Sequence, residues 1–145
     1  MNRISVLKGL LIMGLFSLLT FTGCAGINKE YDIVGFYFQE SGYNRGFEIK
    51  IDDNKLIYNN YDEGKSKKRR LNEDMVADLL DIFADYDIYS WDGYNEVDED
   101  VLDGNGFTLW IDYSNHTDVK AHGSNAFPAD YYSFKLDILS FVNNL

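Results

Sequence analysis

The chain has few of the residues on which common catalytic and metal sites depend. It holds one cysteine and two histidines among 145 residues. A single cysteine cannot build an internal disulfide framework, and so small a set of cysteine and histidine ligands argues against a tight zinc site. The sequence also lacks a phosphate-binding glycine loop and a dinucleotide-binding fingerprint. We therefore expect no resident metal and no cofactor.

Basic residues are also in short supply. The 24 acidic residues outnumber the 13 lysines and arginines, which gives a formal net charge of −11. Residues 1–23 contain two basic residues and no acidic one, so the remainder of the chain carries −13. This acidity argues against a nucleic-acid partner. The 11 tyrosines, 10 phenylalanines and two tryptophans are enough for a real hydrophobic core, and the length suits a single domain.

The N-terminus has the pattern of an export signal. Arg3 and Lys8 precede residues 9–21, a run of 13 residues without a charge. A positive segment followed by an apolar run of this length is typical of a signal peptide, and the run is short for a membrane span.

The end of this run resembles the lipobox of bacterial lipoproteins. Thr22 and Gly23 are the small residues expected before the cysteine, which here is Cys24, whereas Phe21 stands where the family usually has leucine. The resemblance implies cleavage after residue 23 and a diacylglyceryl group on the Cys24 thiol. Buried acyl chains contribute about 0.8 kcal/mol per methylene, so the chain would be anchored to the outer face of the cytoplasmic membrane. We expect a signal peptide over residues 1–23, a lipidated tether over 24–31 and one domain over 32–145.

Hydrophobic periodicity predicts an α+β fold. Alternation predicts strands over residues 47–52 and 107–113, and each is followed by a turn and a returning strand, over 55–61 and 118–122. The apolar run 32–39 predicts a strand buried on both faces. Helical spacing predicts an amphipathic helix over residues 73–86, with Asn72 as its N-cap, and a second helix that begins at Pro128. The order is β-β-β-α-β-β-α, which we interpret as an antiparallel sheet of about five strands with two helices on one face.

Two charged segments have alternative interpretations. Residues 65–70 are basic and predict a solvated loop, although contact with anionic lipids or wall polymers is an alternative. Residues 92–105 are acidic and glycine-rich, which raises the possibility of a calcium loop. Counted from Asp98, however, Leu102 and Leu109 occupy two ligand positions of an EF-hand, so that pattern fails. A solvated acidic loop is the favoured interpretation, and an irregular cation site is the alternative.

The sequence offers no catalytic constellation but does suggest a binding surface. His122 and Ser124 could be drawn into a triad with Asp130, but no nucleophile elbow surrounds Ser124. Polar groups beside large aromatics are typical of binding pockets. We therefore expect a site where two segments meet, with these candidate residues: Trp91, Asp92, Tyr94, His122, Ser124 and Asn125. The competing interpretation is structural, with Trp91 in the core and Asn125 as the cap of the last helix.

Trp110 is set apart by its position in a predicted strand. It lies on the face opposite Phe107, Leu109 and Ile111, so we expect it outside the main core or under a helix. Exposed tryptophans are typical anchors for partners or flat ligands such as sugars.

The second half of the chain also resembles uncharacterised secreted or lipidated domains of low-GC Gram-positive bacteria. The motifs that carry this resemblance are Trp91-Asp92-Gly93, Asp103-Gly104, residues 107–113 and residues 122–128. The resemblance implies no activity. The expected function is a binding or interaction module with an envelope protein or glycan as partner. The alternative is an envelope hydrolase that uses paired carboxylates.

Overall fold

The computed structural model describes residues 33–42, 46–101 and 104–145. The predicted signal, the tether and Cys24 lie outside the described residues. The elements along the chain are β1 (Ile33–Ser41), β2 (Phe47–Asp52), β3 (Lys55–Asn60), β4 (Lys65–Arg70), α1 (Glu73–Asp85), the short 3₁₀ helix η1 (Ile88–Trp91), β5 (Asn95–Val97), β6 (Gly106–Tyr113), β7 (Val119–Ser124) and α2 (Tyr131–Asn143). No helix in the described ranges is long and apolar enough to cross a membrane.

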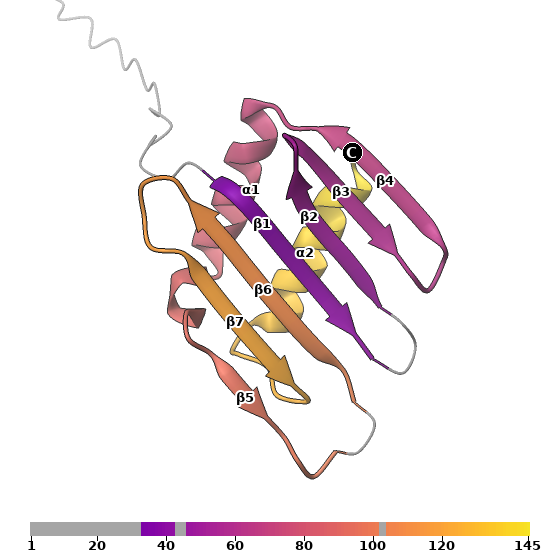
Figure 1. The fold of residues 1–145 in the computed structure, drawn as a ribbon, viewed down its shortest axis with the longest axis vertical. Helices are drawn as coiled ribbons and strands as arrows, with labels where there is room; N and C mark the ends of the chain where they lie inside the picture. Colours follow the sequence, from indigo (N-terminus) through magenta and orange to yellow (C-terminus); the bar gives the residue numbers. More distant parts are fainter. Residues whose placement is uncertain (1–32, 43–45, 102–103) are drawn as a thin grey trace, which may run out of the picture.

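The strands form one sheet, and both helices pack on the same face of it (Figure 1). The strand order is β4-β3-β2-β1-β6-β7-β5, and every pair is antiparallel except β5 with β7. The α+β class and the two helices are therefore confirmed. The expected count of about five strands is wrong, since the sheet has seven.

The basic run accounts for one of the two missed strands. Residues 65–70 are not a loop: they form the edge strand β4, paired with β3. All six residues are exposed, so no apolar alternation marks the strand. A lysine-rich edge is also a common way to prevent a sheet from pairing with other chains.

Two side chains of the basic run bind the end of α2. The Lys67 ammonium donates to the main-chain oxygen of Asn143 at 2.8 Å, and the Arg69 guanidinium donates to that of Leu145 at 2.9 Å. Cations at a helix C-terminus satisfy its last carbonyls and oppose the negative end of the helix dipole. β4 therefore contributes to attaching α2, whose C-terminal end lies beside it in Figure 1.

The core lies between the sheet and the two helices. Alternate residues of the strands face the helices, and the buried set includes Phe36, Phe38, Ile49, Phe107, Leu109 and Ile111. Phe38 is fully buried near the middle of this layer, with its ring 5.2 Å from that of Phe134 on α2. The expectation that β1 is buried on both faces is wrong, because Val34 is 60% exposed and Tyr37 is only half-buried.

The helix starts agree only in part with the sequence. Asn72 is the N-cap of α1, as predicted, and its side chain accepts a hydrogen bond from the Met75 amide at 2.8 Å. α2 begins at Tyr131 rather than at Pro128, and its N-cap is Asp130. Asp130 has a positive φ and makes no side-chain cap. Asn125 therefore does not cap α2.

Candidate functional site

The two segments expected to form a site lie side by side in the fold. The Gly93 amide donates to the Lys120 carbonyl at 2.9 Å, and the His122 amide donates to the Tyr94 carbonyl at 2.8 Å. Parallel pairing of β5 with β7 continues this contact to Ser124. The side chains of the predicted residues, however, point to different places.

Trp91 belongs to the core. It is 4% exposed and ends η1, with its indole packed against Phe107, Tyr131 and Phe134 at centroid distances of 5.2 to 6.4 Å. An indole enclosed by three other rings has no free face for a ligand. Trp91 thus has the structural role that the competing interpretation gave it.

Two other predicted residues hold the backbone. The Asp92 carboxylate accepts a hydrogen bond from the Lys120 amide at 2.9 Å, near the start of β7. The Asn125 side-chain amide donates to the carbonyl of Val101 at 3.0 Å and to that of Asp98 at 3.4 Å. Asn125 itself has a φ of 59°, a left-handed conformation that asparagine tolerates better than most residues. It therefore fixes the acidic loop against the end of β7.

Replacing Asn125 with alanine should lower the free energy of unfolding by about 1–2 kcal/mol. The variant loses side-chain hydrogen bonds worth about 1 kcal/mol, and alanine tolerates the left-handed conformation less well than asparagine does. Asn125→Gly is the matched control, because it removes the side chain without the backbone strain and should lose less. Urea denaturation measures both variants, and limited proteolysis should show faster cleavage within residues 96–105. Equal stability of wild type and both variants would contradict this role.

Of the three remaining predicted residues, Tyr94 and His122 line a shallow depression on the sheet face that neither described helix covers, whereas Ser124 ends β7 outside that lining. The volume of this depression is about 490 Å³, and Thr108, Trp110 and Lys120 complete its main lining. The Thr108 hydroxyl and the His122 Nδ1 lie 3.3 Å apart. Trp110 is 46% exposed, as its place in the alternation predicted, and the Lys120 ammonium lies 5.2 Å from its ring centroid.

A second depression lies on the other side of Trp110. It has a volume of about 290 Å³, and its lining includes Gly35, Tyr37, Asp52, Trp110 and Asp112. A Cβ at Gly35 would lie 2.8 Å from an Asp112 carboxylate oxygen, so a glycine here leaves room for that side chain. Because both depressions share Trp110, the indole stands between them as the central exposed group of this face.

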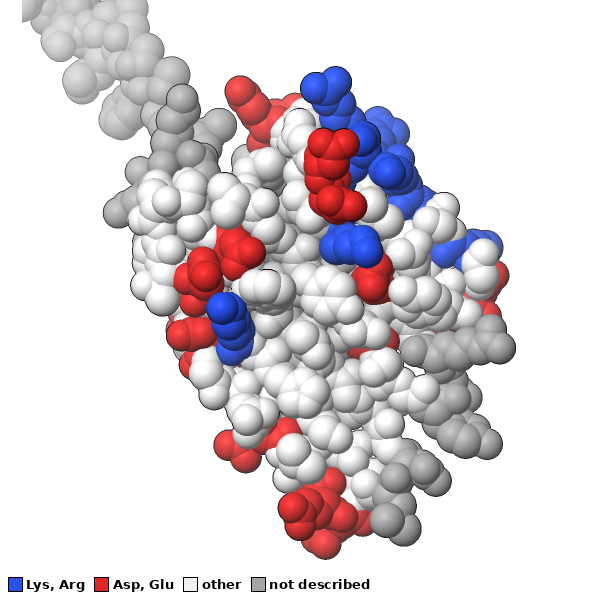
Figure 2. Space-filling model, in the orientation of Figure 1, with Lys and Arg blue, Asp and Glu red and all other residues white. Residues whose placement is uncertain are grey.

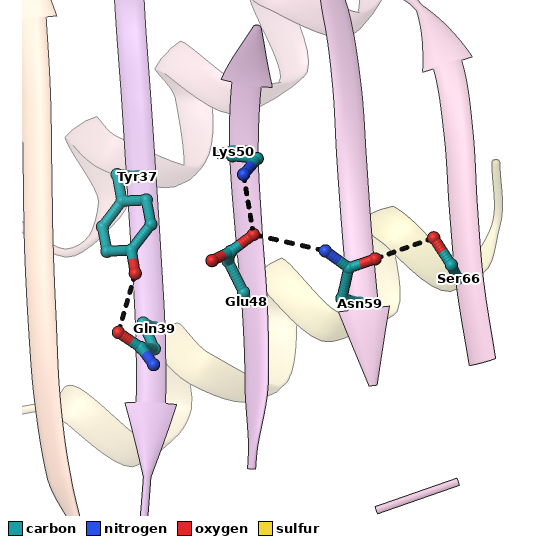
Figure 3. Close-up of polar contacts among 6 residues, drawn as sticks. All are labelled: Tyr37, Gln39, Glu48, Lys50, Asn59 and Ser66. Carbon is teal, nitrogen blue, oxygen red and sulfur yellow. Dashed lines mark hydrogen bonds and ion pairs between the residues drawn. The ribbon is translucent and has the colours of Figure 1, made fainter. Parts of the chain in front are cut away.

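A row of polar side chains crosses the same face. In strand order from β7 to β4 it consists of His122, Thr108, Gln39, Glu48, Asn59 and Ser66, which are successive register partners. Figure 3 shows part of this row: Asn59 donates to Glu48 at 3.2 Å and accepts from the Ser66 hydroxyl at 2.7 Å. The Tyr37 hydroxyl donates to Gln39 at 2.7 Å. These hydrogen bonds orient the side chains before any ligand arrives.

An ion pair lies inside this face. Lys50 lies 3.0 Å from Glu48, and that hydrogen bond and attraction raise the pKa of the Lys50 ammonium. Burial, together with the nearby Glu48 carboxylate, raises the pKa of the Tyr37 hydroxyl. Tyr37 therefore stays protonated at neutral pH and acts as a hydrogen-bonding group.

No pattern in the sequence points to Tyr37, Gln39 and Thr108 as site residues. The apolar run predicts a strand with two buried faces for Tyr37 and Gln39, and the strand order that places them beside Trp110 is a tertiary property. Within the described ranges, no group of three histidine, cysteine or acidic side chains is arranged to hold a metal ion. Comparison with protein-family models and with curated proteins finds no match to this chain.

Proposed function

We propose that this chain is a lipid-anchored extracytoplasmic binding module and that its ligand surface is the uncovered sheet face around Trp110. The observation that carries the proposal is a 46% exposed tryptophan between two depressions that share it. Tryptophan is enriched among the residues that dominate binding energy, because its large apolar ring gains much from being covered. The lipobox-like Thr22-Gly23-Cys24 junction supports the anchor and the location.

The shape of the face supports binding over catalysis. Both depressions are shallow, so neither excludes water from a reacting group in the way that electrostatic catalysis requires. One observation favours the alternative hydrolase: Asp52 and Asp112 line the same depression from β2 and β6. Asp52→Asn with Asp112→Asn tests it, because paired-carboxylate hydrolysis of envelope material would be abolished while a binding surface would keep most of its affinity.

In a Cys24→Ala background, which carries no lipid that could itself hold the chain on membranes, Trp110→Ala should lower retention of the chain on envelopes of the source bacterium by tenfold or more. Removing the central ring removes the largest apolar contact of the face, while folding needs little from a half-exposed side chain. Tyr132→Ala is the matched control, since Tyr132 is a 61% exposed aromatic on α2, in the helix layer on the other side of the sheet. Retention is measured by sedimentation with purified envelopes, and the melting temperature is measured in parallel. Equal retention of the Cys24→Ala chain with and without Trp110→Ala would contradict the proposed surface.

Cys24→Ala should abolish incorporation of labelled fatty acid and leave either an unprocessed precursor or a released protein. The thiol is the only atom on which the diacylglyceryl group can form. Mass spectrometry of the wild type should find the lipid on Cys24. A wild type that takes up no fatty acid, beside a variant that matures to the same size, would show that the anchor does not exist.

A further inference from the structure

We propose that the ligand of this face is an uncharged oligosaccharide that lies across the sheet from β5 to β2, with one sugar ring stacked on Trp110. The inference rests on the proposed function and names the chemical class that its surface takes. It is drawn from four features of the face: its aromatic pair, its polar row, its charge and its length.

The aromatic pair offers a flat apolar contact. Trp110 and Tyr37 are direct register partners on β6 and β1, so their side chains are neighbours on the same face. A sugar ring has an apolar face of C–H groups and a rim of hydroxyls, which matches a ring with polar side chains beside it. A purely apolar partner would leave those side chains without hydrogen bonds, which is unfavourable for each polar group that it buries.

The polar row next to the aromatic pair suits hydroxyl groups. Thr108 is the register partner of both His122 and Gln39, so three side chains form a continuous line beside Trp110. Hydroxyl, amide and neutral imidazole groups each donate and accept hydrogen bonds. Sugar hydroxyls do the same, whereas an ion of one sign would use only donors or only acceptors.

The charge of the face selects a neutral ligand. Figure 2 shows a continuous white area over the middle of this face, with red and blue side chains around it, in a chain of net charge −11. Glu48 and Lys50 face each other within the sheet, and the Lys120 ammonium lies over Trp110. An anionic polymer would be repelled by the acidic body, and a cationic one would be repelled by the Lys120 ammonium at Trp110, although Asp52 and Asp112 lie in the second depression.

The distance that the two depressions span across the sheet is longer than one sugar unit. The two depressions together extend from β5 to β2, across the order β5-β7-β6-β1-β2. Four spacings of about 4.8 Å between neighbouring strands give about 19 Å, which is the length of a short oligosaccharide rather than of a single sugar. Trp110 lies on the middle strand of that path, so each end of the bound oligosaccharide would lie in one of the two depressions.

The test is a titration of the full-length chain in a detergent without sugar headgroups. The probes are neutral tetrasaccharides of N-acetylglucosamine, glucose, mannose and galactose, the corresponding monosaccharides, and tetragalacturonate as the anionic probe. Calorimetry gives the affinity, and tryptophan fluorescence reports on Trp110. We expect at least one neutral tetrasaccharide to bind at least tenfold more tightly than its monosaccharide and than tetragalacturonate. Trp110→Ala should weaken that binding tenfold or more, Thr108→Val should weaken it several-fold, and Tyr132→Ala should leave it unchanged.

Three results would overturn the inference: no binding by any neutral tetrasaccharide, tighter binding of tetragalacturonate, or an affinity that Trp110→Ala does not change. The envelope experiment separates this failure from failure of the proposed function. If Trp110→Ala loses retention on envelopes while no neutral sugar binds, the face is a binding surface for another class of ligand. If retention is also insensitive to the substitution, the proposed surface itself is wrong.

Discussion

Replacing Trp91 with alanine should lower the free energy of unfolding by about 3–5 kcal/mol, the usual cost of truncating a buried tryptophan. Trp91 is 4% exposed and contacts rings from β6 and from α2. Its removal leaves a cavity in the layer that joins the helices to the sheet, and a rigid core fills such a cavity only in part. Urea denaturation followed by far-UV circular dichroism measures the loss.

Trp110→Ala is the matched comparison, because it removes a tryptophan side chain that lies on the side of the sheet away from the core. Exposed substitutions usually change stability by less than about 0.5 kcal/mol, so this variant should unfold close to wild type. The two substitutions thus distinguish a loss of folding stability, expected for Trp91→Ala, from a loss of ligand binding, expected for Trp110→Ala. A Trp91→Ala variant as stable as wild type would mean that the ring is not in the core, and would favour the interpretation of Trp91 as a binding residue.

The elements that the sequence predicted correctly are those whose own residues show hydrophobic periodicity. β2, β6 and β7 alternate apolar and polar residues, and this alternation alone predicts the face on which Trp110 lies. β4 carries no such pattern, since all six of its residues are exposed and its strand conformation depends on pairing with β3. β5 has three exposed residues and depends in the same way on β7. Tertiary pairing decides such strands, and a single sequence does not display it.

The sequence predicted which two segments meet at the candidate site, but not where their side chains point. Residues 91–94 and 122–125 meet as expected, but side-chain direction in η1 and after β7 follows no simple period. As a result, the sequence did not show that the Trp91 side chain lies in the core or that the Asn125 side chain points toward the acidic loop. The face that includes Tyr37 and Gln39 needed the strand order β1-β6-β7, which joins residues more than 60 positions apart in the chain.

Replacing Glu40 with alanine should cost about 2–3 kcal/mol, near the lower end of the range for breaking a buried ion pair. The Glu40 carboxylate accepts from the Tyr131 hydroxyl at 2.7 Å and from the Lys135 ammonium at 2.9 Å, and so ties β1 to α2. The side chains of Glu40 and Lys135 are only 12% and 20% exposed, and Tyr131 is fully buried. Without Glu40, a poorly hydrated ammonium and a buried hydroxyl lose their common acceptor.

Glu40→Gln is the matched control, since its amide oxygen can still accept from Tyr131 while the charge partner of Lys135 is lost. We expect it to lie between wild type and Glu40→Ala in urea denaturation. Equal losses for the two variants would show that only the charge matters, and no loss for either would show that the three side chains do not hold α2 in place.

The same cluster predicts how stability changes in alkaline solution. Burial, then the hydrogen bond to Glu40, raises the pKa of the Tyr131 hydroxyl far above its ordinary value of 10.0. The folded protein therefore keeps this proton at a pH where the unfolded chain releases it. The contribution of the protonated Tyr131 hydroxyl to the free energy of unfolding is therefore present in full below about pH 10. As the pH rises further, the free energy of unfolding falls by up to about 1.4 kcal/mol per pH unit for one proton. Tyr131→Phe should be less stable than wild type at pH 7, because a hydrogen bond is lost, yet should lose less stability between pH 10 and pH 11. Parallel slopes for the two proteins in that interval would mean that Tyr131 titrates in the folded state as it does in the unfolded chain.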